Sequence, residues 1–554
     1  MVFTSCIDDL NVTPKDDDEF LSEDFYKDSN SYKKVLAKLY AGLYVGGNDG
    51  DGQADISGIG GDFSSYLRLL FVCQEFTTDE AIIAWADGTL PTMNTQTWTP
   101  VNEFLYGTYS RSFYQISLAN EFLRQTTDDK LTARGVDAAL KAEIATFRAE
   151  ARFLRAFDYV QLMDLFGNVP ITTEADPVGF YNPVQKSRAE VFAFVESELK
   201  DLDTSLKATK GNEYGRIDKT AAKFLLAKIY LNAKVYTGTA KNTECITACK
   251  EVIASGYSFA NVPYFHLFSA DNDKNGSQNE IIFPVVSDGN LIRATGAGMS
   301  FILHAGIGGS MKASDRGMDG GWQGTRTRKE FVQSFPDENG IGDKRGSFYK
   351  DGQSLDINNV GKFTDGYAVT KFINKNADGS AAQRNDIPDT DFPMFRMADV
   401  YLMYAEAVLR GGTGGDISTA VGYVNQIRTR AGATAITATD LTLDFILAER
   451  GRELFWECHR RTDLVRFDKF TGSSKIWQWK GGVKNGTSTE PYRNLMPIPS
   501  RAIQANPTLK KSTDFFKQFY QIFKGKTWVI TSHNLKLKQH IWEVELLKVH
   551  SLIL

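Results

Sequence analysis

The residues best suited to hold a metal ion form the acidic segment DNDKNG, from Asp271 to Gly276. It matches the first half of an EF-hand loop, in which carboxylate and amide oxygens at alternating positions ligate calcium. The position that needs a bidentate glutamate is Ile282, and Glu280 lies two residues early, so an EF-hand is excluded. A looser calcium site stays open as an alternative to a solvated turn, with Asp271, Asp273, Asn275 and Glu280 as its ligands.

A second concentration of ionisable residues lies on a predicted helix with the sequence ERGRELFWECHRRTDLVRF. Its members could be taken for a catalytic or anion-binding cluster. However, opposite charges follow one another at i, i+3 and i+4, a spacing that favours mutual pairing. We expect these side chains to lock the helix to its neighbours: Glu449, Arg452, Glu453, Arg460, Arg461, Asp463 and Arg466.

Sequence motifs of known catalytic sites are missing. The chain has no HExxH, GxSxG or GxxxxGK[ST], and no GxGxxG that opens a helix after a strand. Carboxylates are frequent, but without known geometry they do not identify a glycosidase. The formal net charge of -5 over 554 residues offers no general footprint for nucleic acid. We expect a binding protein that requires no cofactor, and not an enzyme.

The cysteines follow neither a metal-binding spacing nor a disulfide framework. We expect buried free thiols at Cys73, Cys245, Cys249 and Cys458. Cys6 differs, because small residues precede it in MVFTSC and an acidic run follows, as at the start of a mature lipoprotein. The alternative is an incidental cysteine, since no basic and apolar signal region precedes it. The sequence has no stretch of about eighteen apolar residues, the length needed to span a membrane, so a lipid anchor would be the membrane attachment.

Helical periodicity dominates four regions, near residues 31–44, 99–166, 218–255 and 395–431. Small and large apolar residues alternate on one face in FRAEARFLRAFDYVQLM, KTAAKFLLAKIYLNA and RMADVYLMYAEAVLR. Alanine at close-contact positions lets paired helices interlock, as in tetratricopeptide repeats, although the spacing here is irregular. Residues 257–390 instead predict short strands and long loops, where a binding site is expected.

Three C-terminal stretches resemble the SusD/RagB family of outer-membrane nutrient-binding lipoproteins. They are FPMFRMADVYLMYAEAVLR, AERGRELFWECHRRTDLVRF and WQWKGGVKNGTSTEPYRNLMPIPSRAIQANP. The resemblance continues upstream through TTDEAIIAWADG, EARFLRAFDYVQLMDLFGNVP, GRIDKTAAKFLLAKIYLNAKVYTG and FSADNDKNGSQNEIIFP, and covers roughly residues 6 to 506. The founding, starch-binding member of the family is the most similar one.

The resemblance implies a mainly α fold, an irregular tetratricopeptide-like body of about four helix pairs with long loop-rich insertions and a few short strands. It implies a lipoprotein leader and flexible linker at 1–30, one body at 31–514 and an atypical tail at 515–554. It also implies a surface-exposed protein, anchored in the outer membrane through Cys6, that forms a lid on a SusC-like TonB-dependent transporter. Such a protein captures oligosaccharides without cleaving them.

The starch-binding member holds its glucan on an arc of aromatic rings, with an arginine and an asparagine. By local motif, the corresponding residues here are Arg68 in YLRLLF, Trp85 in IIAWADG, Phe301 in GMSFILHAG and Trp322 in DGGWQGTR. Phe301 falls where that protein has tyrosine, and Gly88 replaces the asparagine, which removes one polar contact. Aromatic faces suit this task because the C–H-rich face of a sugar stacks on a π-surface.

Other interpretations stay open. The same lid mechanism could serve a different glycan or nutrient, and a glycoside hydrolase or a protein-binding tetratricopeptide scaffold are further alternatives. Core packing is the alternative for each ring of the arc, and it is the expected role of Trp477 and Trp479. The tail at 515–554 departs from the family, either as a frameshifted end or as a basic appendage.

Overall fold

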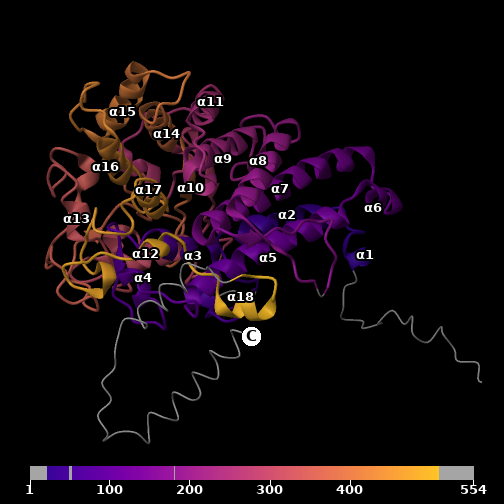
Figure 1. Cartoon of the computed structure of the whole chain (residues 1–554), viewed down its shortest axis with the longest axis horizontal. Coiled ribbons are helices and arrows are strands. Elements are labelled where there is room, and N and C mark those ends of the chain that lie inside the picture. The colour runs from indigo at the N-terminus through magenta and orange to yellow at the C-terminus, as the bar shows by residue number, and fades with distance from the viewer. Residues whose placement is uncertain (1–21, 49–52, 180, 293, 511–554) are drawn as a thin grey trace, which may run out of the picture. The chain divides into compact units, whose positions relative to one another are not determined.

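The computed structural model describes residues 22–48, 53–179, 181–292 and 294–510 (Figure 1). These residues form a mainly α-helical body with four two-stranded antiparallel sheets, which confirms the predicted fold class. Cys6 and the tail at 515–554 lie outside the described residues. None of the helices described is both long enough and apolar enough to cross a membrane.

The elements follow one another with short strands between long helices. The helices are α1 Ser22–Phe25, α2 Ser31–Ala41, α3 Tyr66–Gln74, α4 Pro91–Thr95, α5 Glu103–Gln125, α6 Asp128–Ala133, α7 Ala138–Phe166, α8 Arg188–Asp201, α9 Lys219–Leu231, α10 Ala233–Thr237, α11 Asn242–Ile253, α12 Gly298–Ala305, α13 Lys329–Val332, α14 Met397–Leu409, α15 Ile417–Ala431, α16 Leu443–Leu454, α17 Arg460–Arg466 and α18 Ser500–Ala505. The strands are β1 Ile82–Ile83, β2 Val169–Pro170, β3 Gln185–Lys186, β4 Ile281–Val285, β5 Thr325–Arg326, β6 Phe348–Tyr349, β7 Ala368–Val369 and β8 Phe392–Arg396.

The long helices pack in series: α5 on α7, α7 on α8, α8 on α9, α9 on α11, α11 on α14, and α14 on α15 (Figure 1). Alanines of the predicted pattern of small and large apolar residues are buried in two of these helices. Ala221 and Ala227 of α9 and Ala398 and Ala405 of α14 are fully buried. Because a methyl group lets two backbones approach closely, these positions let neighbouring helices interlock as the sequence predicted.

The structure contains helices in two segments where the sequence predicted none. Ordered packing begins before residue 31, because Tyr26 is 6% exposed and its ring lies 5.1 Å from that of Tyr32. The predicted leader therefore already contains α1. The loop-rich region 257–390 contains α12, whose eight residues are all buried.

The charged segment breaks into α16 and α17 instead of forming one helix. Trp456 and Cys458 adopt left-handed φ angles of 61° and 65° between the two helices. Their backbone N–H groups donate to carboxylates from another segment, Trp456 to Glu80 Oε2 at 3.3 Å and Cys458 to Glu75 Oε1 at 2.6 Å. These bonds replace the helical ones, so the chain turns where an uninterrupted helix was predicted.

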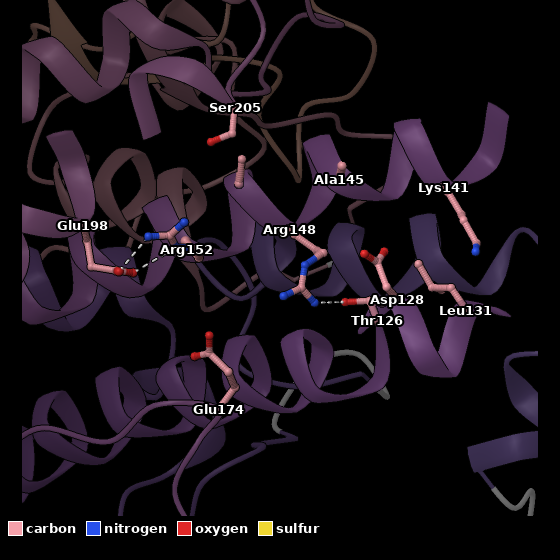
Figure 2. Close-up of a pocket in the computed structure, with 11 residues that line it drawn as sticks. Thr126, Asp128, Leu131, Lys141, Ala145, Arg148, Arg152, Glu174, Glu198 and Ser205 are labelled. Atoms are coloured by element: carbon pink, nitrogen blue, oxygen red, sulfur yellow. Dashed lines mark hydrogen bonds and ion pairs between the residues drawn. The ribbon is translucent and has the colours of Figure 1, made fainter. Parts of the chain in front are cut away.

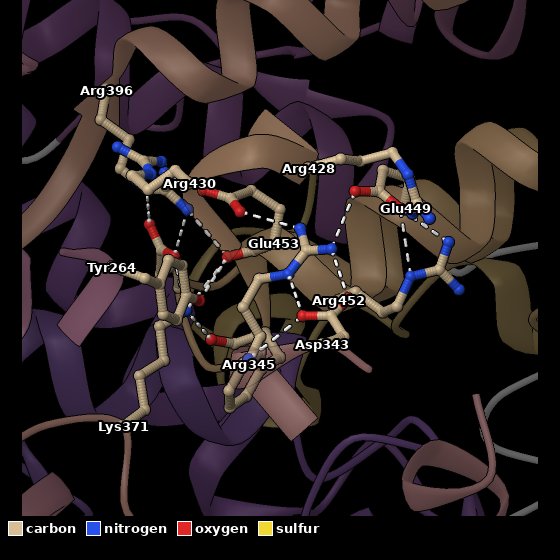
Figure 3. A network of polar contacts seen from close by, with 12 residues as sticks. Tyr264, Asp343, Arg345, Lys371, Arg396, Arg428, Arg430, Glu449, Arg452 and Glu453 are labelled. Atoms are coloured by element: carbon tan, nitrogen blue, oxygen red, sulfur yellow. Dashed lines mark hydrogen bonds and ion pairs between the residues drawn. The ribbon is translucent and has the colours of Figure 1, made fainter. Parts of the chain in front are cut away.

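The seven ionisable residues predicted to lock this segment are all buried and paired, which confirms that role, and Figure 3 shows Glu449, Arg452 and Glu453 among them. Glu453 Oε1 accepts from Arg396 Nη1 at 2.7 Å and from Arg430 Nη2 at 2.8 Å. Glu453 Oε2 accepts from Arg345 Nη1 at 2.9 Å. The network joins β8, α15, α16 and the turn that carries Arg345. Most partners lie far away in sequence, so the pairs hold separate elements together and not only successive turns of one helix.

Glu75 and Glu80 form a buried carboxyl pair below this break. Both residues are at most 1% exposed. Burial raises the pKa of Glu75 to about 7. Burial and the charge of Glu75 raise the pKa of Glu80 well above its ordinary value. The folded protein therefore favours the protonated pair.

We expect this pair to make stability fall as pH rises. Between the ordinary pKa of glutamate, 4.5, and the folded value of about 7, the folded state binds more protons than the unfolded state. The stabilisation is complete below that window and is lost as pH rises through it. Glu75→Gln resembles the protonated form, so its melting temperature should fall less than that of the wild type between about pH 5 and about pH 8. Parallel pH profiles of the two proteins would contradict this expectation.

Candidate functional site

The pairing of β1 with β5 brings together two tryptophans that are 237 residues apart in sequence. Ile82 pairs with Arg326 and Ile83 with Thr325, so Trp85 follows one strand and Trp322 precedes the other. The indole N–H of Trp85 donates to the carbonyl oxygen of Trp322 at 3.0 Å, and the two rings lie 6.2 Å apart at 45°. Both side chains are partly exposed, and together they form a bent aromatic surface, called here the Trp85–Trp322 platform.

The C-terminal end of α12 holds the Trp322 side of the platform. The backbone N–H of Trp322 donates to the carbonyl oxygen of His304 at 2.7 Å. The indole of Trp322 stacks on the imidazole of His304, with ring centroids 4.4 Å apart and an angle of 10°. A Cβ atom on Gly324 would lie 2.8 Å from the indole of Trp85, so only glycine lets the two segments approach this closely.

Phe301 and Arg68 lie beneath the platform. Phe301 is 1% exposed and meets Trp85 edge-on at 6.0 Å. The guanidinium of Arg68 lies 4.3 Å from the centroid of Phe301 and 5.8 Å from that of Trp85. Its Nη1 donates to the carbonyl oxygens of Asp62 at 2.9 Å and Gly296 at 2.7 Å. Burial lowers the pKa of Arg68 to about 9, and the group still carries its charge at neutral pH.

The structure therefore gathers all four residues predicted for the glycan site, but in two layers. Trp85 and Trp322 offer ring surface to a ligand. Phe301 has no exposed face, so we interpret it as a support for Trp85 and not as a stacking ring. Arg68 is 4% exposed, and we interpret it as a support too. An asparagine at Gly88 would require Glu103 to move, because a Cβ there would lie 1.7 Å from Glu103 Oε1, and it would have to adopt a left-handed φ of +43°.

His304 is a site residue that the sequence reasoning missed. It lies three positions after Phe301, which places both on the same part of α12. It is 4% exposed, and its Nε2 lies 3.3 Å from Asp319 Oδ1. The helical spacing from Phe301 was a usable signal, but α12 lies in a region predicted to be loops and strands.

Two other hollows in the described residues are less suited to stack on a flat ligand. A cavity of about 390 Å³ lies between α6, α7 and α8 (Figure 2), and no aromatic ring lines it. A groove of about 790 Å³ runs along α15, and Phe259, Tyr264 and Phe265 contribute rings. However, the guanidinium of Arg430 lies 3.8 Å from the centroid of Phe259, and Tyr401 stacks on the same ring. Tyr264 and Phe265 meet edge-on at 5.2 Å, so the rings of this groove already pack on other groups of the protein.

The acidic turn from Asp271 does not include Glu280. Both Arg396 and Arg430 bind the Glu280 carboxylate, with Arg396 Nη1 at 3.1 Å from Oε1, so this predicted ligand belongs to the buried ion network. Asp271 Oδ1 accepts from Asn275 Nδ2 at 3.1 Å and from the backbone N–H of Ala377 at 2.9 Å. Across the part of the chain that the structure describes, no three His, Cys, Asp or Glu side chains gather as metal ligands do. Calcium binding by Asp271, Asp273 and Asn275 stays a prediction.

Comparisons with known proteins agree with this architecture. The model of the SusD family matches residues 343–515, and a model described as starch-binding, associating with outer membrane, matches residues 64–231. The chain is 32% identical to the starch-binding protein SusD of Bacteroides thetaiotaomicron, over 92% of this chain and 96% of that protein. It is 25% identical to a SusD-like protein of Bacteroides ovatus, over 69% of this chain and 70% of that protein. A solved SusD superfamily structure from Parabacteroides distasonis has a TM-score of 0.67 at 21% identity, and the match covers 89% of this chain and all of that one.

Proposed function

The chain belongs to the SusD family, and on that basis we propose that it is a non-catalytic protein that captures starch-like oligosaccharides. The observation that carries this proposal is the Trp85–Trp322 platform, which two separate segments build from partly exposed rings. The bend of 45° between the rings suits a curved chain of sugar rings better than a flat one. Pairs of aromatic rings gain about 0.5–1.5 kcal/mol beyond the area they bury, and we take this as the scale for a sugar stacked on each ring.

The platform is held rigid before any ligand binds. The Trp85 indole N–H is bonded to the Trp322 backbone, Trp322 rests on His304, and Phe301 packs against Trp85 from below. A site that does not need to order its rings loses little conformational entropy on binding. This rigidity supports a binding role, in which affinity depends on the shape of the platform.

The finer parts of the proposal concern the place of action. We propose that Cys6 carries a lipid that anchors the protein at the cell surface, in the outer membrane. The captured oligosaccharide then passes to a SusC-like TonB-dependent transporter. A matching family model whose description includes association with the outer membrane supports this location.

A glycan panel tests the choice of ligand. Affinity electrophoresis of the full chain in gels that contain starch, and in gels that contain glucans or other polysaccharides of different linkage, compares the candidates directly. We expect retardation by starch-like α-glucans. Retardation only by another polysaccharide would show that the platform binds a different glycan. This alternative needs a test because Gly88 replaces an asparagine that contacts the glucan in the starch-binding member.

We expect His304 to contribute to affinity without touching the glycan. In His304→Ala the indole of Trp322 loses its stacking partner and becomes mobile, so affinity for maltoheptaose should fall by about two- to tenfold. In His304→Phe a ring remains beneath the indole and most of the affinity should be kept. Calorimetric titration of both variants measures the difference. Equal affinities in His304→Ala and the wild type would show that the stack does not position Trp322.

A further inference from the structure

A second pocket lies away from the Trp85–Trp322 platform and shares none of its residues. Its volume is about 210 Å³, below the roughly 300–1,000 Å³ of pockets for drug-sized molecules, which suits one ring-sized ligand. The loop KGNEYGR, from Lys210 to Arg216, forms one wall, and Tyr257 and the segment from Gln278 to Pro284 form the rest. We call it the Tyr214 pocket.

The ring of Tyr214 is exposed but fixed in position. The residue is 45% exposed, and its hydroxyl donates to Asp391 Oδ2 at 2.7 Å in the interior. Burial and the Asp391 carboxyl hold the pKa of Tyr214 well above its ordinary value, so the hydroxyl keeps the proton that it donates. No other aromatic ring of the described residues stacks on Tyr214. A rigid ring with a free face is the feature that a sugar ring requires for stacking.

The loop around Tyr214 is also held from beneath. The backbone N–H of Lys210 donates to Asp218 Oδ2 at 2.7 Å, and Tyr257 Oη donates to the same oxygen at 3.2 Å. Arg216 Nε donates to Glu150 Oε2 at 3.1 Å. Because these bonds fix the loop in the free protein, a ligand would not have to order it.

Polar groups of the pocket wall keep unused hydrogen-bonding capacity. Gln278 Oε1 accepts from the backbone N–H of Gly276 at 2.7 Å, which leaves Nε2 without a partner among the described residues. Asn212 Nδ2 donates to the carbonyl oxygen of Ile217 at 2.6 Å, and Asn212 Oδ1 has no partner among the described residues. One free donor and one free acceptor beside an exposed ring match the hydroxyl groups and the apolar face of a sugar.

Two basic and two acidic side chains line the pocket, those of Lys210, Arg216, Glu213 and Asp218, so their formal charges cancel. Lys33 pairs with Glu213 at 2.7 Å, and Lys210 Nζ lies 3.2 Å from Asn279 Oδ1 and 4.9 Å from the centroid of Tyr257. From these observations we propose that the Tyr214 pocket is a second glycan site, which binds a single neutral pyranose ring. The pocket would hold one ring of an oligosaccharide whose main part binds elsewhere, or a separate chain. The choice of a sugar as ligand rests on the proposed function.

Saturation-transfer difference NMR with maltose and with the methyl pyranosides of glucose, galactose and mannose tests the second site. The parent is the full chain with Trp85→Ala and Trp322→Ala, which removes the platform. We expect this parent to give saturation-transfer signals from at least one of these sugars. Addition of Tyr214→Ala should weaken that binding by about tenfold or more, because the stacking ring is lost.

Two further variants separate loss of the site from loss of the fold. Gln278→Ala removes the free amide without touching the anchors of Tyr214, and it should also weaken binding. Tyr181→Ala is the matched control, because Tyr181 is a 41% exposed tyrosine that does not line the pocket. It should leave the signals unchanged.

Absence of signals in the parent, or equal signals with and without Tyr214 and Gln278, would overturn the second site. Failure of the proposed function has a different signature. In that case Trp85→Ala and Trp322→Ala, made in a chain that keeps Tyr214 and Gln278, would not change the affinity for maltoheptaose. This outcome does not depend on the results with the Tyr214 and Gln278 variants.

Discussion

Replacement of Glu453 by glutamine is expected to cost about 3–5 kcal/mol of folding stability, the largest effect of any single polar substitution considered in this protein. Arg345, Arg396 and Arg430 all donate to this carboxylate, at 2.7–2.9 Å. Burial by itself would raise the pKa of Glu453, but the three guanidinium groups outweigh it and lower that pKa to about 2. The neutral amide of the Glu453→Gln variant would remove one negative charge from three buried arginines. Its N–H group would also point toward one of these guanidinium groups.

Denaturant unfolding followed by circular dichroism measures this cost, with soluble yield as a second readout. The control is Glu121→Gln, because Glu121 pairs with Arg124 at 2.7 Å but its side chain is 46% exposed. Exposed pairs of this kind contribute about 0–1 kcal/mol, so the control should unfold almost as the wild type does. If Glu453→Gln also unfolded within about 1 kcal/mol of the wild type, the network would not hold α16 in place as argued.

Trp322→Ala is expected to lower affinity for maltoheptaose by at least about thirtyfold, the size of effect typical of a central binding residue. The substitution removes one ring of the platform directly. It also exposes the edge of Trp85, whose indole lies 6.2 Å from that of Trp322. Calorimetric titration of the variant against the wild type measures the loss.

Two matched variants make this result specific. Trp322→Phe keeps a smaller ring on His304 and should retain part of the affinity. Trp85→Ala removes the other ring and should show a loss of similar size. Unchanged affinity in Trp322→Ala with a normal melting curve would show that the glycan binds elsewhere on the chain.

The helical body was predictable from the sequence where helices have one buried face. Helix α7 ends at Phe166, directly before Gly167 with its φ of +75°, which is where the GNVP motif predicted the end. Asp137 caps the start of the helix by accepting from the backbone N–H of Leu140 at 2.9 Å. Helix α3 was missed because all nine of its residues are buried, so it has no amphipathic period to detect. Helix α8 carried a usable signal, the capping box formed by Ser187 and Glu190, which the sequence reasoning overlooked.

The site was less predictable, because its residues meet only through tertiary structure. Periodicity says nothing about the two-residue strands that bring Trp85 and Trp322 together, and family resemblance alone pointed to both rings. Resemblance also carried Phe301 over as a stacking ring, whereas Phe71, Phe76 and Trp85 surround it edge-on in the structure. Glu280 was predicted as a calcium ligand from the spacing of the acidic turn. That spacing does not reveal its partners Arg396 and Arg430, which are distant in sequence.

Calorimetric titration of the wild-type chain with maltoheptaose, followed by product analysis of the same samples, tests the central claim most directly. The account predicts saturable binding and a glucan recovered intact, with no new reducing ends. Release of reducing ends would contradict it, and so would a lack of binding to maltoheptaose together with every other glycan of the panel.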